Sequence, residues 1–331
     1  MRQLGLPRTL SDHNAILVGK KWEDWGPKPF HFFNGWLEDK GLMEETVKGW
    51  NGCKSAGSKG FSLASKAKEA KKSMRCWIAV KKRVVGEGKF IENILAELDS
   101  KAEVDGWTDC LRKERMDCLA KLWKELRKEE QLWRQKSRVN WLKEGDKNSK
   151  FFHSMKNGRR MRNYFNDISF GSGKISDPVL IKEGVVDFFK NYYTKVKWNH
   201  PSIIGLNFMG LKDSEREALK VGFSEEEVWA VVCSCDGNQT PGPDDLNLDF
   251  VKANWNAIQV DLMNFIHEFH RNGESVKDLN KTFVALIPKR THPETMKDFR
   301  PISLVNSMYK ILAKVLANRL KLVMGCLISE S

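Results

Sequence analysis

The chain has 331 residues, of which 41% are hydrophobic and 30% are charged, so it is long enough to form two or three domains with real cores. Its 56 Lys and Arg against 43 Asp and Glu give a net charge of +13, which indicates a polyanionic partner, most simply nucleic acid. Seven scattered cysteines without a C-x2-C pair argue against a zinc ribbon or a redox motif and for an intracellular protein, and no apolar run reaches membrane-spanning length.

An Asp–His pair near the N-terminus is the first candidate site. Asp12 and His13 precede the apolar run 15–18, which predicts a short strand. An aspartate beside a histidine can orient the imidazole and stabilise its charged form. Most such dipeptides are surface accidents, so the pair by itself is weak evidence of catalysis.

Residues 61–137 are rich in Lys, Glu, Arg, Leu and Ala and predict a pair of long amphipathic helices. One predicted helical stripe consists of Leu119, Leu122, Leu126 and Trp133, with Trp123 beside it. Farther on, Gly145-Asp146 predicts a turn, and Asn157-Gly158 predicts the end of the short helix that follows it.

Positive charge is concentrated between residues 112 and 162, where 17 Lys or Arg face 7 Asp or Glu, a balance of +10. Aromatic residues interleave with this charge, a pattern typical of single-strand nucleic-acid binding. In the alternative interpretation the aromatics are core residues and only the charges face water. The predicted nucleic-acid-binding residues of this stretch are Arg134, Lys136, Arg138, Arg159, Arg160 and Arg162, and the aromatics include Trp133, Trp141, Phe151 and Phe152.

Several later elements follow from local signals. Gly171–Gly173 predicts a hairpin tip between two short strands. Asp177 before Pro178 predicts a helix start, and Ser224 with Glu227 predicts a capping box. The residues expected to be buried by the three helices are Ile181, Val185, Phe188 and Tyr192; then Val228, Val231 and Val232; then Trp255, Ile258, Leu262, Phe265 and Phe269, the last helix ending near Asn272-Gly273.

The C-terminal stretch predicts a strand, a loop, an extended segment and a helix. Residues 283–287 are apolar and β-prone, and Arg300 before Pro301 is held extended. Lys289 and Arg300 place one cation at each shoulder of the loop, which suits the grip of a polyphosphate; a solvated basic loop is the alternative. The helix from about residue 305 repeats Tyr309, Leu312, Leu316 and Leu320, with Lys310, Lys314 and Lys321 on a neighbouring face.

Together these strings resemble a known family. The sequences LIPK (286–289), DFRPISL (298–304), YKI (309–311) and LANRL (316–320) resemble the opening of the reverse transcriptase domain of plant LINE-type (non-LTR) retrotransposons. Thr240–Asp244 resembles the family's (S/T)PGPDG, with Asp245 in place of the last Gly, so the turn after Asp244 is expected to be altered. Residues 141–153 are similar to the WLxxGDxNTKFFH of the family's linker, and residues 11–34 to the last strands of its endonuclease.

The resemblance implies an internal fragment of such a polyprotein, with a mixed α+β and mainly helical fold. Residues 1–35 would be the remnant of an endonuclease β-sandwich, residues 36–209 a basic helical linker, and residues 210–331 the fingers portion of a right-hand polymerase fold. Asp12 and His13 would belong to the endonuclease site, Lys289 and Arg300 would contact the nucleotide triphosphate, and Lys310, Lys314 and Lys321 would lie near the template.

The implied reaction of the parent enzyme is RNA-templated DNA synthesis with Mg²⁺, and the implied partners are RNA and DNA, as single strands or as a hybrid. Asp244-Asp245 follows a proline in a turn, unlike the aspartate pair of polymerases, and His267 and His270 lack zincin spacing. We therefore expect these 331 residues to hold no metal and to neither polymerise nor nick alone. A non-catalytic nucleic-acid-binding protein, domesticated or decayed, and a helical scaffold are the alternatives; the sequence leaves open the oligomeric state and the choice of nucleus or cytoplasm.

Overall fold

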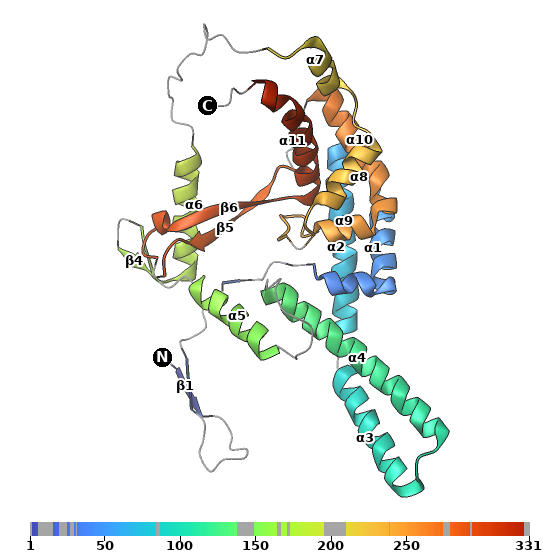
Figure 1. The fold of residues 1–331 in the computed structure, drawn as a ribbon. Coiled ribbons are helices and arrows are strands. Elements are labelled where there is room, and N and C mark those ends of the chain that lie inside the picture. The colour runs from blue at the N-terminus through green and yellow to red at the C-terminus, as the bar shows by residue number, and fades with distance from the viewer. Residues whose placement is uncertain are drawn as a thin grey trace. The chain divides into compact units, whose positions relative to one another are not determined.

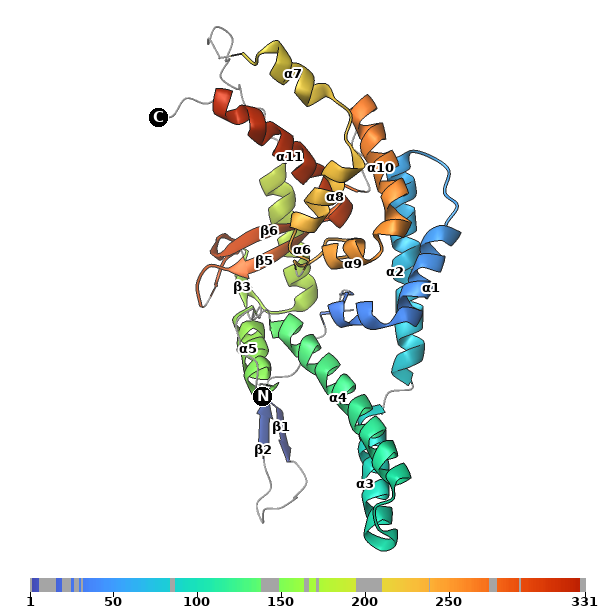
Figure 2. The same cartoon turned by 45° about the vertical axis from the view of Figure 1, so that its right-hand side comes forward.

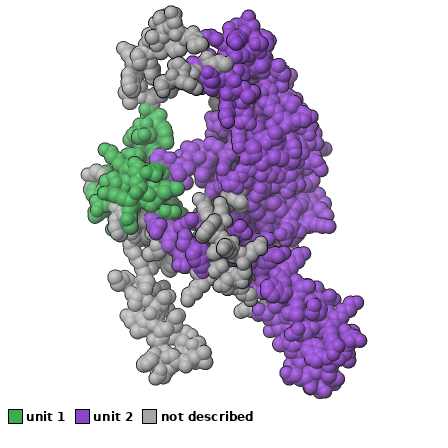
Figure 3. Space-filling model, in the orientation of Figure 1, with its two compact units in different colours: residues 1–29, 163–201, 287–300 green, residues 30–162, 202–286, 301–331 purple. Residues whose placement is uncertain are grey.

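The computed structural model describes residues 2–5, 16–19, 25–26, 30, 32–83, 87–137, 149–163, 167–170, 173–194, 210–237, 239–273, 279–291 and 293–327. These residues are mainly helical, with three two-stranded sheets among them (Figure 1). The chain forms two compact units (Figure 3). The smaller contains residues 1–29, 163–201 and 287–300, and the larger contains residues 30–162, 202–286 and 301–331.

Helices from distant parts of the sequence build the core of the larger unit. A 3₁₀ turn (Asn34–Glu38) leads into α1 (Lys40–Gly52), which packs along α2 (Lys59–Arg83), and α10 (Trp255–Asn272) packs on α2 as well (Figure 2). The side chain of Asp39 accepts a hydrogen bond from the N–H of Leu42 and so begins α1. The largest fully buried side chains shared by these helices include Leu42, Trp50, Leu63, Met74 and Phe265.

A polar group inside this core ties α1, α2 and α10 together. Trp50 Nε1 donates to Asp261 Oδ2 over 2.8 Å, and Lys66 Nζ lies 2.8 Å from the same carboxylate. Both partners of the ion pair are about four-fifths buried, and three groups from three helices satisfy one another there. Buried polar groups of this kind fix one packing arrangement because each lost partner would leave a costly unpaired atom.

The predicted N-cap of the helix after Ser224 is confirmed, whereas the carboxylate of Glu227, which a capping box would turn back to Ser224, bonds Arg319 instead. Ser224 accepts a hydrogen bond from Glu227 N–H and begins α8 (Glu225–Ser234), which buries Val228, Val231 and Val232 as predicted. Helix α10 buries the predicted stripe at its centre and ends at Gly273, which has a φ of +65°. The remaining helices of this region are α7 (Asp213–Lys220), α9 (Leu248–Ala253) and α11 (Ser307–Leu327).

Helix α11 buries a different face from the one predicted. Met308, Ile311, Leu312 and Val315 are fully buried, and α11 packs against α8. Tyr309 and Leu316 are only half-buried, and Leu320 is 50% exposed. Two overlapping stripes at spacings of three and four exist in this helix, and contact with α8 selects the one that the periodicity did not single out.

The region predicted as two long helices contains three. Helix α2 ends at Arg83, and α3 (Glu87–Asp105) is separated from α4 (Asp109–Ser137) at Gly106, whose φ of +81° suits a residue without a side chain. Helices α3 and α4 pack against each other, and the predicted α4 stripe is half-buried. The prediction of a single pair was wrong because it rested on the overall helix-favouring composition of residues 61–137 and gave no weight to the glycines at the two breaks, Gly86 and Gly106.

Helix α5 (Ser149–Arg162) runs through Asn157 and Gly158, so the predicted helix end there was wrong. A glycine inside a helix costs about 1 kcal/mol relative to alanine. Packing offsets this cost, since α5 lies against α4 and buries Phe152 to 3% exposure.

In the smaller unit, β1 (Arg2–Gly5) pairs antiparallel with β2 (Ile16–Gly19), and β3 (Ile168–Ser169) pairs with β4 (Lys174–Ile175) as the predicted hairpin. Asp177 accepts from the N–H groups of Val179 and Leu180 and begins α6 (Pro178–Tyr193). Of the residues predicted to be buried by α6, Ile181 is buried and Val185 and Phe188 are half-buried. Tyr192 is 68% exposed, contrary to prediction, with its ring stacked on that of Phe188. None of the described helices is both long and apolar enough to cross a membrane.

Candidate nucleic-acid interface

The turn formed by residues 240–246 caps helix α11. Asp244 N–H donates to Asn306 Oδ1 over 2.9 Å, and Ser307 N–H donates to Asp244 Oδ2 over 2.7 Å. The Ser307 hydroxyl donates to the carbonyl of Leu246. Asp244 is half-buried, its Oδ1 atom is buried, and burial of the carboxyl raises its pKa to about 7. The proline- and glycine-rich string is therefore a fixed platform for the start of α11.

Two positions of this turn have demanding backbones. A Cβ on Gly242 would lie 2.4 Å from the carbonyl carbon of Val305, so only glycine fits. Asp245, which stands where the resembling family has glycine, has a φ of +56° in the left-handed region that glycine adopts most easily. Its carboxylate forms an ion pair with Lys71 of α2, which holds the conformation in place.

The adjacent carboxylates of this turn do not fit a polymerase metal site. One carboxylate oxygen of Asp244 accepts a hydrogen bond from the N–H of Ser307, and the carboxylate of Asp245 forms an ion pair with Lys71. Two-metal catalysis needs carboxylates that converge on an open site. Among the described residues no group of three His, Cys, Asp or Glu could hold a metal ion.

The hairpin of β5 (Thr282–Pro288) and β6 (Phe299–Val305) carries the two predicted phosphate-binding cations. Asp298 organises its loop by accepting from the N–H groups of Thr295 (2.9 Å) and Glu294 (3.0 Å) and from Arg290 (2.7 Å). These donors, the backbone N–H groups foremost, lower the pKa of Asp298 to about 2. Arg290 is thus committed to the loop.

Lys289 and Arg300 remain at the surface of that hairpin. The ammonium of Lys289 donates to the carbonyl of Lys297 over 2.7 Å, and its side chain is exposed. Arg300 is exposed on β6. A lysine anchored by one carbonyl keeps further donors available for an anion, since an ammonium has three.

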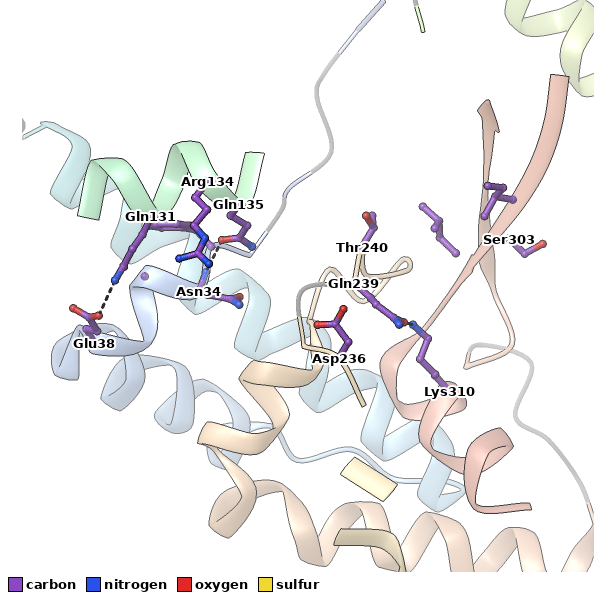
Figure 4. Close-up of a pocket in the computed structure, with 14 residues that line it drawn as sticks. Asn34, Glu38, Gln131, Arg134, Gln135, Asp236, Gln239, Thr240, Ser303 and Lys310 are labelled. Atoms are coloured by element: carbon purple, nitrogen blue, oxygen red, sulfur yellow. Dashed lines mark hydrogen bonds between the residues drawn. The ribbon is translucent and has the colours of Figure 1, made fainter. Parts of the chain in front are cut away.

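A groove of about 710 Å³ lies within the larger unit, and we call it the amide groove (Figure 4). Arg134 of α4 and Lys310 of α11 both line it, although 176 positions separate them in the sequence. Lys310 Nζ donates to Gln239 Oε1 over 2.7 Å, and Gln131 Nε2 donates to Glu38 Oε1 over 3.4 Å. The polar side chains that face this space include Asn34, Gln131, Gln135, Asp236, Gln239 and Ser303.

The described basic residues of α4 and α5 differ in what they contact. Arg134, Lys136, Arg159 and Arg162 are exposed, and Arg159 also donates to the carbonyl of Ser137. Lys136 and Lys156 lie 5.0 and 4.7 Å from the ring centre of Trp133. The lysines therefore occupy the faces on which a base would stack.

The two adjacent phenylalanines of α5, Phe151 and Phe152, differ in whether they lie in the core or at the surface. Phe152 is 3% exposed and belongs to the core, whereas Phe151 is 42% exposed. The core interpretation therefore holds for Phe152, and stacking remains open for Phe151. Trp141 lies outside the described residues.

The remaining predicted site residues are scattered or lie outside the description. Asp12, His13 and Arg138, and the side chain of Arg160, are outside the described part of the chain. On α11, Lys314 is half-buried and Lys321 is exposed. His267 and His270, predicted as surface residues, are exposed, and their Nε2 atoms lie 3.0 and 2.9 Å from backbone carbonyls.

Sequence reasoning missed Arg319. Its guanidinium lies 3.9 Å from the centre of the Phe223 ring and forms two bonds to Glu227, of 2.8 and 2.7 Å. It also donates to the carbonyls of Val221 and Gly222. The arginine of the LANRL string is thus a clamp between α11 and the start of α8, and its place in that string was the one available signal.

Comparison with known proteins gives one distant relative. No protein-family model matches the chain. Over 328 residues, 95% of the chain, it is 24% identical to the "Transposon TX1 uncharacterized 149 kDa protein" of Xenopus laevis. The chain spans 25% of the length of that protein. Because the match runs through nearly every described element, the chain is a distant relative of a transposon-encoded protein.

Proposed function

We propose that the chain is part of a retrotransposon-encoded RNA-directed DNA polymerase and supplies nucleic-acid-binding and nucleotide-contacting surfaces. The observation that carries this proposal is the amide groove. Arg134 and Lys310 belong to the linker-like and polymerase-like stretches, were predicted independently to bind nucleic acid, and line one space. The relationship to a transposon protein and the charge of residues 112–162 support the same assignment.

In this proposal, residues 1–35 derive from an endonuclease, residues 36–209 form the basic linker, and residues 210–331 are fingers. The template is RNA, and Mg²⁺ acts in the parent enzyme through residues other than those described here. Exposed cations attract the phosphate backbone without reading its sequence, and the polar side chains of the groove can bond sugars or bases. The described residues thus bind and position the strand.

Lys289 and Arg300 are proposed to contact the triphosphate of the incoming nucleotide. Asp298 fixes the loop between them, so both cations stand on a rigid hairpin. In an active polymerase that contains this segment, Lys289→Ala and Arg300→Ala should each raise the KM for nucleotide about tenfold or more, because a charge-assisted bond contributes about 1.5–3 kcal/mol. Steady-state primer extension measures this, and template affinity should stay unchanged. An unchanged KM for nucleotide in both variants would remove these residues from the site.

The chain itself should bind single-stranded RNA or DNA with little sequence preference and a steep salt dependence. Each phosphate neutralised on a single strand contributes about −0.7 to the log–log slope of affinity against salt. With about five contacts, we expect a slope near −3 to −4. Replacing Arg134, Lys136 and Arg162 by Gln should make the slope shallower by about 2. Fluorescence anisotropy over a salt series measures this.

A matched control removes the same charge elsewhere. Lys48, Lys72 and Lys220 are exposed lysines that each pair with a neighbouring glutamate on their own helix. Their replacement by Gln should leave the slope within about half a unit of that of the unmodified chain. Equal slopes for the two triple variants would show that binding is not localised. Absence of binding at low salt would favour the helical scaffold instead.

A further inference from the structure

A second cleft, of about 410 Å³, lies between α2 and the turn of residues 240–246. We call it the α2 cleft, and it shares no lining residue with the amide groove. Phe61, Lys68 and Lys71 contribute to it from α2, and Asp244 and Lys281 contribute from the polymerase-like stretch. All of these residues belong to the larger unit.

The cleft gathers cations next to an exposed ring. Lys68 and Lys281 are exposed, and Lys71 carries its ion pair with Asp245 at the same place. Phe61 is 43% exposed, whereas Leu63 and Met74 of the same helix are fully buried. Ala64, Leu279 and Met308 complete an apolar wall. A site for a simple anion would need the lysines but not the ring.

Asp244, which lines this cleft, has one carboxyl oxygen without a hydrogen-bond partner in the described part of the chain. Its Oδ2 accepts from Ser307 N–H, while its Oδ1 is buried and has no partner among the described residues. Buried polar atoms are nearly always paired, so an unpaired one marks strain, a function or a missing partner. An acidic peptide would gain nothing from a carboxyl at this position.

We infer that the α2 cleft binds one nucleotide residue of a nucleic-acid strand, with its phosphates on Lys68 and Lys281 and its base against Phe61. A nucleotide is the ligand class that combines flanking negative charge, a π face and hydrogen-bonding edges. The inference rests on the proposed function, because the strand is the same ligand. It adds a contact at α2, outside the basic stretch of residues 112–162.

The test uses the whole chain and a fluorescein-labelled oligouridylate. The double variant Lys68→Gln/Lys281→Gln should make the salt slope shallower by about 1.4, two phosphates at about 0.7 each. Phe61→Leu should weaken binding about tenfold, whereas Phe61→Tyr, which keeps the ring, should retain affinity. The control Lys48→Gln/Lys72→Gln removes two exposed lysines that do not line the cleft. Thermal unfolding of each variant checks that the fold is unchanged.

The outcomes separate this inference from the proposed function. If the unmodified chain binds no oligouridylate, both fail. If replacing Arg134, Lys136 and Arg162 by Gln makes the salt dependence of affinity shallower but the cleft variants match their control, only the inference is overturned. Uridine monophosphate serves as the second probe. If it binds with the same affinity as the strand, and if this binding depends on Phe61, the cleft is a free-nucleotide site and the strand assignment is overturned. Loss of affinity in Phe61→Tyr as well as Phe61→Leu would overturn the stacking contact.

Discussion

Replacing Gly242 by Ala should destabilise the larger unit by at least about 3 kcal/mol, since forcing extra atoms into a well-packed site costs about 1–3 kcal/mol or more. The new Cβ would lie 2.4 Å from the carbonyl carbon and 2.5 Å from the carbonyl oxygen of Val305, and 2.7 Å from Asn306 N. These are backbone atoms, so no side-chain rotation relieves the clash. The turn must move away from the β6–α11 junction, and the hydrogen bonds of Asp244 with Asn306 and Ser307 are then lost.

Urea denaturation of the variant measures this loss, and Gly158→Ala is its control. A Cβ on Gly158 would meet nothing within 4 Å, and Gly158 lies inside α5. Alanine should therefore stabilise α5 by up to about 1 kcal/mol. If Gly242→Ala lowers the free energy of unfolding and Gly158→Ala raises it, the steric clash, and not the loss of a glycine as such, causes the destabilisation. A Gly242→Ala chain as stable as the unmodified one would mean that the turn is not seated on α11.

Local signals in the sequence predicted local structure well. Asp177 and Ser224 begin helices as expected because an Asp or Ser side chain satisfies helix N–H groups within a few residues of itself. The strand of residues 283–287 appears within β5, and the helix of Trp255 ends at a left-handed glycine. Each of these features depends on neighbours along the chain, which the sequence displays directly.

Features decided by distant partners were not predicted. The buried face of α11 depends on contact with α8, and the continuation of α5 through Gly158 depends on packing against α4. Both helices have local patterns that permit more than one outcome. The exposure of Tyr192 is of the same kind, because an aromatic ring on a helix can stack on its own neighbour and stay outside the core.

The candidate site shows the same limit for charges. The sequence identifies which residues are cationic but not which of them are already engaged. Arg290 binds Asp298, Arg159 binds the carbonyl of Ser137 and Lys136 lies over the Trp133 ring, whereas Arg134 and Arg300 are exposed. The meeting of Arg134 with Lys310 in the amide groove requires the fold, since no local pattern relates positions so far apart.

Arg319→Ala should destabilise the larger unit by about 3–5 kcal/mol, the usual cost of removing one partner of a buried ion pair. The Arg319 side chain is 12% exposed, and Glu227 is 28% exposed, so solvent screens the pair weakly. The substitution removes two bonds to Glu227, two bonds to backbone carbonyls and the contact with the Phe223 ring. The N–H of Glu227 also donates to Ser224, the residue that caps α8, so the start of that helix loses its connection to α11. Chemical denaturation, followed by circular dichroism, measures the loss.

Two further variants identify the physical cause of that loss. Arg319→Lys keeps the charge but cannot form the planar fork, so it should recover less than half of the stability. Lys321→Ala, two positions away on an exposed part of α11, should change stability by no more than about 0.5 kcal/mol. If Arg319→Lys were as stable as the unmodified chain, charge alone would hold α11 to α8, and the geometric account of the clamp would be wrong. If Arg319→Ala kept its stability but lost nucleic-acid binding, this arginine would belong to the ligand surface, and the LANRL string would report function instead of packing.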